Sequence, residues 1–488
     1  MKMAVVRSGI VVGVEPLEVN VIVSGRPMKT IQIALFLVAV IVTGVTPVRA
    51  QSASTLDAVV QRLDQLERQN AELREQVGLL RQELDSFKQP GPDGTPPTLA
   101  RIEALEEKVE VNAGRLSEQE QVKVEGSQRA PLRVTGMALF NAYANGRHAA
   151  PDYPGIARIN RGSINSGGTS RGTVFGFAFD SPEAVLGGQL HGSVLLDLFG
   201  DTGSSQQVLV PHPRLKFASI QGQWKTRSIL MGQDRMIFAP REPNTLARTN
   251  APLAGQGNLY GYRPQVRFEQ KIGLGANQDV RAEIGVVETF EHQPMVQSQF
   301  ASTLELRRPA LEGHFQFGHR LDSDRRFEIA SGFHWSTTHI AGTSIPATIF
   351  SVDGVVDPVR WLELTGFAYT GKNTGKTSGS NFVGFTILRP SSGQIQAIPV
   401  REWGGWVQAT FRATPRLSVN LQHGLIDPND DDLLATAVSK NRAYLANTYY
   451  RIAPNVIGGF EVAQVRTRYK AGQHPQNNHF DLYLAYMF

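Results

Sequence analysis

Two glycine-containing stretches of this 488-residue chain could carry chemistry, because their spacing approaches that of catalytic and phosphate-binding loops. Residues 168–172, GTSRG, fit the G-x-S-x-G pattern, in which a turn between a strand and a helix presents a serine nucleophile. Residues 371–377, GKNTGKT, resemble a phosphate-binding loop but have one residue too few between the glycines. We expect no helix after either stretch, although both kinds of site need one. We therefore predict surface loops here, and a protein that is not an enzyme and holds no cofactor.

The composition gives little support for thiol or metal chemistry. The chain has no cysteine, which excludes disulfides, thiolate ligands and thiol nucleophiles. Its eleven histidines are scattered, with no two at metal-binding spacing on an expected helix. Residues 427–432, DPNDDD, could offer oxygen ligands to a divalent cation. A charged surface loop explains them better, and we predict no metal site.

The basic residues are more informative, because charge is unevenly distributed along the chain. Residues 51–130 carry ten basic and fifteen acidic side chains, whereas residues 131–488 carry 34 basic and 27 acidic side chains. Cations that face a narrow passage with walls of low dielectric constant would concentrate anions in it. Five cations lie on the polar face of alternating stretches, namely Arg133, Lys216, Arg263, Arg267 and Arg281. The alternative is that the arginines pair with nearby carboxylates, namely Asp234, Glu242, Glu269 and Glu283.

Strands must position these charges. From Leu132 onward apolar and polar residues alternate, for example in residues 189–198 and 262–269. This period predicts strands with one apolar and one polar face, as lipid outside and water inside a barrel require. Counting gives about sixteen antiparallel strands, which start near residues 132, 173, 188, 213, 227, 262, 279, 307, 326, 348, 360, 399, 416, 438, 455 and 479.

Short turns and long loops alternate between the expected strands. Tight turns lie near residues 225–226, 322–324, 357–358, 414–415 and 453–455, and long loops at 144–172, 237–260, 291–306 and 372–398. An even count with long loops on one rim is typical of transmembrane barrels. Sixteen strands would enclose a water-filled lumen. The predicted fold class is an all-β transmembrane barrel over residues 132–488, preceded by an N-terminal α-helical coiled coil.

The last ten residues predict a closing strand with a continuous apolar face. Its members are spaced by two and end in a terminal aromatic: Phe480, Leu482, Leu484, Tyr486 and Phe488. This pattern resembles the signal that bacterial outer-membrane barrels present to the barrel assembly machinery, and we expect Phe488 to be its recognition residue. A soluble β-sandwich could end in the same way.

The first 50 residues predict a secretory signal peptide. Residues 31–45 form an apolar run that is too short to span a bilayer comfortably, and Ala50 ends a small-residue cleavage site. Because Met28 and Lys29 directly precede this run, we expect Met28 to be the true start. The alternative is an uncleaved anchor helix.

Residues 51–89 predict a coiled coil, which an exported chain would place in the periplasm. Apolar residues fill the a and d positions of nearly five heptads, and Asn70 is the one polar a residue, a device that fixes register and strand number. These core positions are Leu56, Val59, Leu63, Leu66, Asn70, Leu73, Val77, Leu80, Leu84 and Phe87. A lone amphipathic helix is the alternative. A Pro/Gly linker follows at 90–98, then a short helix and connector at 99–131.

The order of signal peptide, coiled coil and barrel resembles the DcaP-type trimeric porins of Gram-negative bacteria. Residues 123–129 (KVEGSQR), 132–136 (LRVTG) and 255–267 (GQGNLYGYRPQVR) are similar to stretches of such porin-like outer-membrane proteins. The resemblance implies a homotrimer of sixteen-stranded channels that pass small hydrophilic, often anionic, solutes. Its partners would be outer-membrane lipid, lipopolysaccharide and the barrel assembly machinery, with no nucleic acid. The proline-rich linker has no counterpart in that pattern.

In the porins that this chain resembles, the loop after the fifth strand folds inward and narrows the channel. The corresponding loop at 237–260 carries Arg241, Glu242 and Arg248. With the five cations of the polar faces, these are the candidate pore-lining or constriction residues. A structural tether or adhesin, with the barrel as an anchor, is the alternative function, and a barrel enzyme is a weaker one. A trimeric autotransporter would donate about four strands per chain, far fewer than counted here.

Overall fold

The computed structural model describes residues 132–149, 155–181, 184–200, 211–247, 252–291, 302–377, 383–388 and 395–488. The strands of this part are β1 (Leu132–Asn145), β2 (Asn165–Thr169), β3 (Val174–Asp180), β4 (Gln189–Asp197), β5 (Arg214–Gln223), β6 (Arg227–Arg235), β7 (Tyr262–Gly273), β8 (Gln278–Phe290), β9 (Arg307–Arg320), β10 (Arg326–Ile340), β11 (Thr343–Val359), β12 (Leu362–Lys372), β13 (Phe385–Leu388), β14 (Gln396–Pro399), β15 (Arg401–Arg412), β16 (Leu417–Pro428), β17 (Val438–Ala453), β18 (Val456–Tyr469) and β19 (Gln476–Met487). Two 3-10 helices, η1 (Thr374–Lys376) and η2 (Asp430–Asp432), interrupt the connections.

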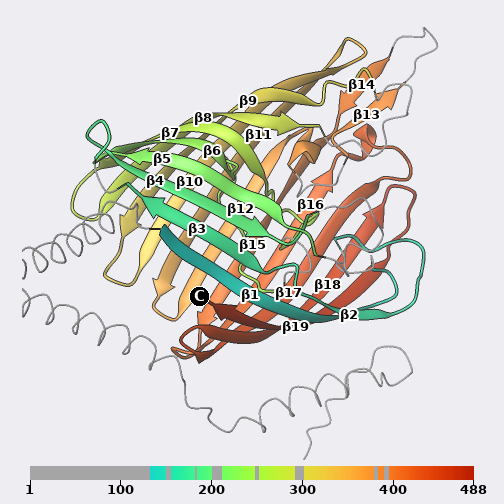
Figure 1. The fold of residues 1–488 in the computed structure, drawn as a ribbon. Helices are drawn as coiled ribbons and strands as arrows, with labels where there is room; N and C mark the ends of the chain where they lie inside the picture. Colours follow the sequence, from blue (N-terminus) through green and yellow to red (C-terminus); the bar gives the residue numbers. More distant parts are fainter. Residues whose placement is uncertain are drawn as a thin grey trace, which may run out of the picture. The chain divides into compact units, whose positions relative to one another are not determined.

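Sixteen of these strands close one antiparallel barrel (Figure 1). β1 pairs with β3 on one side and with β19 on the other, so the sheet of the described residues has no free edge at this seam. β2 pairs with β1 on the same side as β3 does, but nearer the long-loop rim. β13 and β14 form a separate hairpin. The predicted sixteen-stranded barrel is therefore confirmed. The predicted signal peptide, coiled coil, linker and second helix lie outside the described residues.

Strand boundaries agree with the sequence pattern except near prolines and at the last strand. β11 begins at Thr343 instead of 348 and contains the predicted turn at Asp357-Pro358. Pro358 lies where the pairing of β11 with β12 shifts between Val356 and Val359, and such an irregularity tolerates a residue without an N–H. The turn follows at residues 360–361. β19 begins at Gln476 instead of 479.

The barrel wall separates apolar from polar side chains by alternation. Large apolar residues point outward and stay exposed, for example Trp335 (60%), Phe350 (60%) and Val407 (59%). Polar residues on the opposite face are buried inside, such as Asn441 and Asp481, each 0% exposed. An apolar exterior around a polar interior is the arrangement that a bilayer imposes on a barrel. No helix among the described residues is long and apolar enough to span a membrane.

The last strand follows this rule. Leu484, Tyr486 and Phe488 are 51%, 47% and 47% exposed on the outer face, whereas Tyr483 and Ala485, which alternate with them, are buried. The N–H of Gly136 donates to the carbonyl oxygen of Phe488 at 2.9 Å, which ties the chain end to β1. The ring of Phe488 lies 6.0 Å from that of Phe175, so the terminal residue completes the seam where the barrel closes.

We expect Phe488→Asp to lower the amount of folded barrel in the envelope several-fold. The change removes the aromatic terminus of the closing strand and places a carboxylate on the lipid-facing side. Heat-modifiable migration of membrane fractions on gels measures the folded fraction. Ile272→Asp, at an outward position 52% exposed on β7, is the matched control. Equal losses in both variants would show that the chain end has no special role.

Candidate functional site

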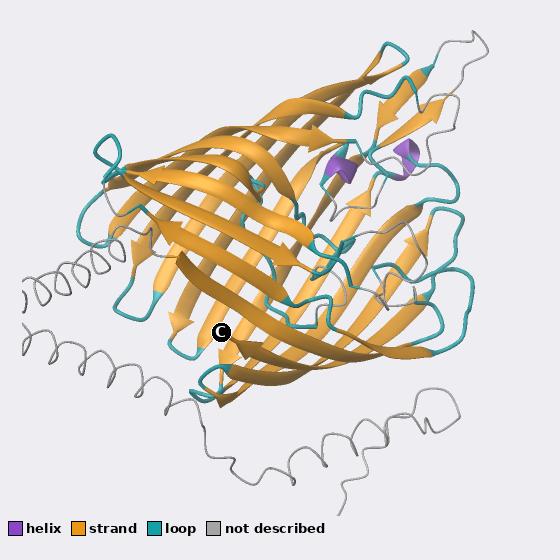
Figure 2. Ribbon diagram, in the orientation of Figure 1, coloured by secondary structure: helices purple, strands orange, loops and turns teal. Residues whose placement is uncertain are grey.

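The connection between β6 and β7, residues 236–261, lies inside the barrel. Its first part, Met236 to Ala239, is buried against β9, β10 and β11. The N–H of Ile237 donates to Oε2 of Glu312 at 2.8 Å, and Oγ of Ser351 donates to the carbonyl oxygen of Phe238 at 2.7 Å. Loop segments are visible within the ring of strands (Figure 2).

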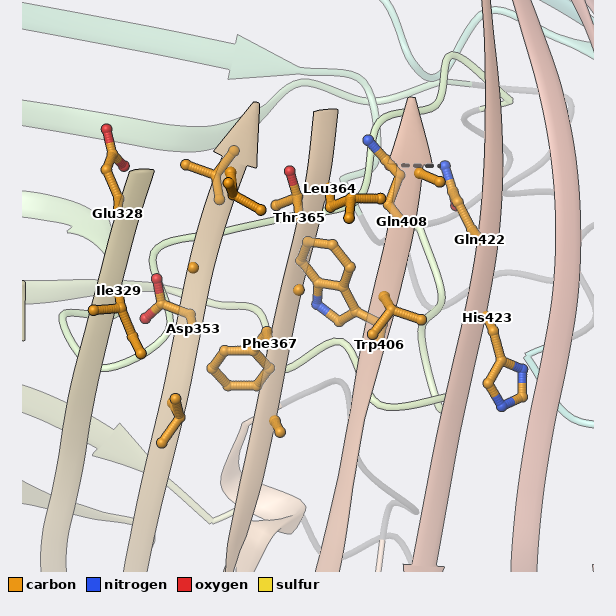
Figure 3. Close-up of a pocket in the computed structure, with 18 of the residues that line it drawn as sticks. Glu328, Ile329, Asp353, Leu364, Thr365, Phe367, Trp406, Gln408, Gln422 and His423 are labelled. Carbon is orange, nitrogen blue, oxygen red and sulfur yellow. Dashed lines mark hydrogen bonds between the residues drawn. The ribbon is translucent and has the colours of Figure 1, made fainter. Parts of the chain in front are cut away.

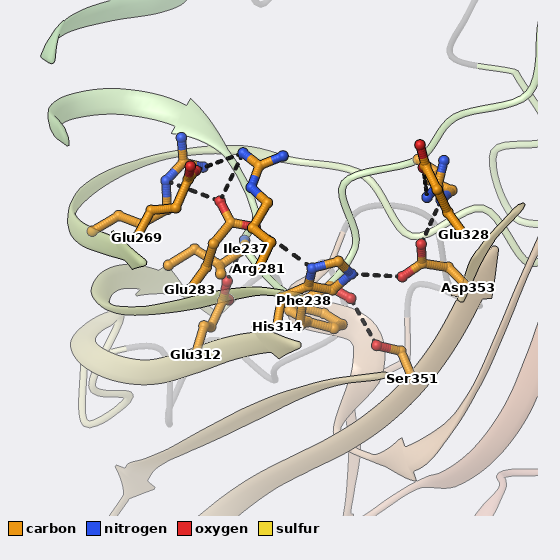
Figure 4. A network of polar contacts seen from close by, with 12 residues as sticks. Ile237, Phe238, Glu269, Arg281, Glu283, Glu312, His314, Glu328, Ser351 and Asp353 are labelled. Atoms are coloured by element: carbon orange, nitrogen blue, oxygen red, sulfur yellow. Dashed lines mark hydrogen bonds and ion pairs between the residues drawn. The ribbon is translucent and has the colours of Figure 1, made fainter. Parts of the chain in front are cut away.

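Arg241 anchors the next part of this inward loop. Its Nε donates to Oδ1 of Asp353 at 2.5 Å, and its NH2 donates to Oε2 of Glu328 at 2.7 Å (Figure 4). Burial disfavours the charged guanidinium, but the hydrogen bonds and negative charges of the two carboxylates outweigh it and raise the pKa of Arg241. The side chain of Asp353 is fully buried, so Arg241 compensates a carboxylate that water does not reach.

The loop then reaches the far wall. Polar side chains from five strands hold its backbone and Thr245, with donor–acceptor distances of 2.5 to 2.9 Å; these are Asn141, Gln408, Gln422, Asn447 and Glu461. Leu246 and Ala247 pack on Leu139, Tyr483 and Ala485 of β1 and β19. These inward polar residues, one from each of five strands, therefore together form the surface that binds the loop.

The returning part of the loop depends on glycine at its closest approach to the wall. Gly257 has φ +101°, and a Cβ there would lie 2.1 Å from the carbonyl oxygen of Gly405. Any side chain would be both strained and obstructed. Asn441 donates to the carbonyl oxygen of Gly255 at 2.6 Å, which fixes this contact from β17.

The predicted cations of β7 and β8 lie in a compensated network (Figure 4). Arg267 faces Asp234 at 3.1 Å and Glu283 at 3.5 Å, and Arg281 faces Glu269 at 2.6 Å and Glu283 at 3.5 Å. His314, 4% exposed, continues the network from Glu283 to Asp353, with Nε2 2.8 Å from Oδ2 of the aspartate. The pairing alternative raised from the sequence therefore describes these two arginines.

A cavity of about 190 Å³ remains between the loop and the opposite wall. Inward residues of β1, β3, β4 and β5 line it on one side, and Glu242 and Tyr260 of the loop line it on the other. The ring of Phe199 lies close to two guanidinium groups, with its centre 5.0 Å from Cζ of Arg171 and 5.5 Å from Cζ of Arg214. Nζ of Lys216 lies 5.0 Å from the ring centre of Tyr262.

The charge around this cavity has a positive excess. Arg214 binds Asp197 through two hydrogen bonds, at 3.0 and 2.7 Å, so the buried carboxylate is neutralised. Glu242 faces Arg235 at 3.6 Å. Arg171 and Lys216, both 8% exposed, add two further positive charges beside the cavity. Aromatic faces attract such cations electrostatically, and the attraction is stronger where water is excluded.

The predicted pore-lining set is therefore dispersed. Lys216 and Glu242 line the cavity, and Arg241, Arg267 and Arg281 serve the networks described above. The side chain of Arg133, at the start of β1, is 64% exposed and faces Asp180 at 2.9 Å. Arg263 is the second residue of β7, and Arg248 lies outside the described residues.

Sequence reasoning missed Arg171, Arg214 and Phe199. Arg171 lies in the GTSRG stretch, where the motif identifies the serine, and not the arginine, as the candidate functional residue. β2 precedes this stretch and β3 follows it, so the helix that a nucleophile elbow needs is not there. Residues 371–377 contain the end of β12 and the three-residue η1, which is too short for an anion site. The described residues contain no group of three or more metal-ligating side chains, and Asp432 of η2 binds Arg401.

No family model matches the chain, and no curated protein matches it either. Among solved structures, the outer membrane channel DcaP of Acinetobacter baumannii matches with a TM-score of 0.60 and 17% identity, over 74% of this chain and 97% of that chain. The anion-selective porin from Comamonas acidovorans matches with a TM-score of 0.49 and 11% identity, over 74% and 100% of the two chains. The DcaP likeness shows that the two chains share the barrel fold.

Proposed function

We propose that this chain is an outer-membrane porin that lets small hydrophilic solutes diffuse through its barrel, with a preference for anions. The observation that carries the proposal is the cavity left between the inward loop and the wall of β1, β3, β4 and β5. Structural likeness to an outer membrane channel supports the same function.

The preference for anions rests on the cavity's cations. At about 4 Å and an effective dielectric constant of about 20, one charge changes the energy of a passing ion by about 4 kcal/mol. Lys216 lines the cavity and Arg171 lies against the ring of Phe199, which also lines it, whereas Arg241, Arg267 and Arg281 form ion pairs in the networks around the loop. The first two therefore support selectivity, and the last three support the position of the loop.

The second candidate function is a tether or adhesin whose barrel is only an anchor. The buried contacts that hold the inward loop argue against it. An anchor gains nothing from buried carboxylates such as Asp353 and Glu461, which are costly unless they are paired. Here they hold a loop against one wall, and a cavity of about 190 Å³ lies on the other side of the loop. This arrangement suits a passage of controlled width.

The proposal includes a bacterial outer-membrane location, a periplasmic coiled coil and a homotrimer. It also includes lipopolysaccharide and the barrel assembly machinery as partners. The heptads with Asn70 support association of chains, because a polar a residue sets strand number. Light scattering of the detergent-solubilised protein measures the number of chains directly.

A planar-bilayer recording of the purified full chain tests the channel function. We expect discrete conductance steps and, across a salt gradient, a reversal potential that favours anions. Because the Debye length shrinks from about 10 Å at 0.1 M to about 3 Å at 1 M salt, the preference should be strongest in dilute salt. A folded barrel that carries no current would favour the tether instead.

A further inference from the structure

Basic residues gather on the outer face of the barrel, close to the rim that carries the long loops. They belong to the ends of four strands at this rim, β12, β15, β17 and β18. In the part of the chain that the structure describes, this outer cluster consists of Lys372, Arg401, Lys440, Arg442, Arg466 and Arg468.

The register of the strands places this outer cluster on the lipid-facing side. Paired residues on neighbouring strands share a face. Phe350, Thr370, Trp403 and Asp427 are successive partners across four strands, and Phe350 and Trp403 are 60% and 52% exposed outward. Arg466 lies over the outward ring of Tyr444, with its Cζ 5.7 Å from the ring centre.

Six cations in this position form three like-charged pairs across neighbouring strands. Lys372 is the register partner of Arg401, Lys440 of Arg468, and Arg442 of Arg466. Directly opposite side chains have Cβ atoms about 5 Å apart, and like charges there destabilise a sheet. Charged side chains on the lipid face also cost free energy. A binding anion would remove both penalties.

Only half of the outer cluster is neutralised by the protein itself. Arg401 binds Asp432, Lys440 binds Asp427, and Arg468 faces Asp430 at 3.4 Å. Lys372, Arg442 and Arg466 form no ion pair with any residue that the structure describes. The outer cluster thus keeps an excess of three positive charges, and one like-charged pair, Arg442 with Arg466, has no carboxylate at either member.

Two adjoining hollows lie on this outer face. One, of about 670 Å³, is lined by Lys372, Arg401, Arg468 and Trp403. The other, of about 730 Å³, lies further from the rim on β10, β11, β12, β15 and β16 (Figure 3). Outward residues that line the second hollow are small in its centre (Gly354, Gly366, Ala368 and Ala409) and large and apolar around it (Ile329, Val352, Leu364, Val407 and Leu421).

We propose that this outer face binds a phosphorylated, multiply acylated glycolipid of the lipopolysaccharide class. Its phosphates would bridge the like-charged pairs of the outer cluster, and an acyl chain would lie in the apolar hollow over Ala368. Four strand spacings separate β12 from β18, about 20 Å. A lipid with two phosphates on one disaccharide can reach separate pairs over this width, whereas a lipid with one phosphate reaches one.

This inference rests on the proposed outer-membrane location, since such glycolipids occupy the outer leaflet. The test titrates diphosphoryl lipid A into the full chain in detergent and counts bound lipid by native mass spectrometry. The variant Arg442→Gln/Arg466→Gln should bind lipid A roughly tenfold more weakly, because charge-assisted contacts to phosphate are lost. The matched control, Arg227→Gln/Arg307→Gln, removes two outward cations elsewhere and should bind as the wild type does.

A second variant tests the hollow independently of charge. Ala368→Phe should fill it and weaken lipid A binding several-fold, whereas Ala138→Phe, outward on β1 beside its partner Tyr486, should not. Binding of phosphatidylglycerol or dephosphorylated lipid A as tight as that of diphosphoryl lipid A would overturn the proposal. So would unchanged binding in both variants, or a change of oligomeric state in lipid-free Arg442→Gln/Arg466→Gln, which would make this face a contact between chains.

Conductance of the same preparations separates this inference from the proposed function. Variants of the outer face should conduct as the wild type does, because their side chains do not face the lumen. A conducting channel without lipid A preference overturns the glycolipid site alone, and a barrel that binds lipid A without conducting overturns the channel alone.

Discussion

Replacing Lys216 by Glu and Arg171 by Gln in one chain should change the channel from anion-preferring to cation-preferring. The double variant makes the cavity between the inward loop and β1, β3, β4 and β5 more negative by three charges. We expect the anion-to-cation permeability ratio to fall by roughly 10- to 100-fold in dilute salt, which needs only about 1.4 to 2.8 kcal/mol of the interaction available at these distances. Reversal potentials across a salt gradient measure the ratio.

The control for this selectivity change is Lys271→Glu. Lys271 also belongs to a barrel strand, but its side chain is 58% exposed near the short-turn rim and faces Asp279 at 3.3 Å. Water and salt screen a charge in this position, so we expect little change in selectivity. If Lys271→Glu shifted the reversal potential as far as the double variant, selectivity would depend on total charge and the cavity would have no special role.

Replacing Arg241 by Met should loosen the inward loop. The variant leaves Asp353 fully buried with only His314 beside it. Removing one partner of a buried ion pair costs about 3–5 kcal/mol, because the other charge stays desolvated. We expect a lower unfolding temperature and single-channel currents that fluctuate between levels as the loop leaves the wall.

Two further variants identify the cause of such an effect. Arg326→Met removes a different partner of Glu328, at 3.4 Å and with a side chain 53% exposed, and such pairs are worth about 0–1 kcal/mol. Adding Asp353→Asn to Arg241→Met removes the uncompensated charge and should restore part of the stability. Steady currents in Arg241→Met, equal to those of the wild type, would show that the loop is held without this anchor.

The sequence was sufficient to predict the barrel because its information is local. A strand repeats every two residues, so Leu484, Tyr486 and Phe488 indicate an outward apolar face without knowledge of their neighbours. Turn residues such as Asp322 and Pro415 mark where strands end. Fourteen of the sixteen starts agree to within two residues with the structure; the other two are those of β11 and β19, and the turn predicted at Pro358 lies inside β11.

The roles of individual charges were decided only by the tertiary structure. Arg241, Arg267 and Lys216 look equivalent in the sequence, since each is a cation on a polar face or loop. Their partners come from strands distant in the chain: Asp353 is 112 residues from Arg241, and the ring beside Lys216 belongs to Tyr262. Electrostatic interactions depend on distance and on burial, which register and the path of the inward loop set together. Periodicity therefore fixes which face a residue occupies, and only the closed barrel determines which cations join the networks around the loop and which lie beside the cavity.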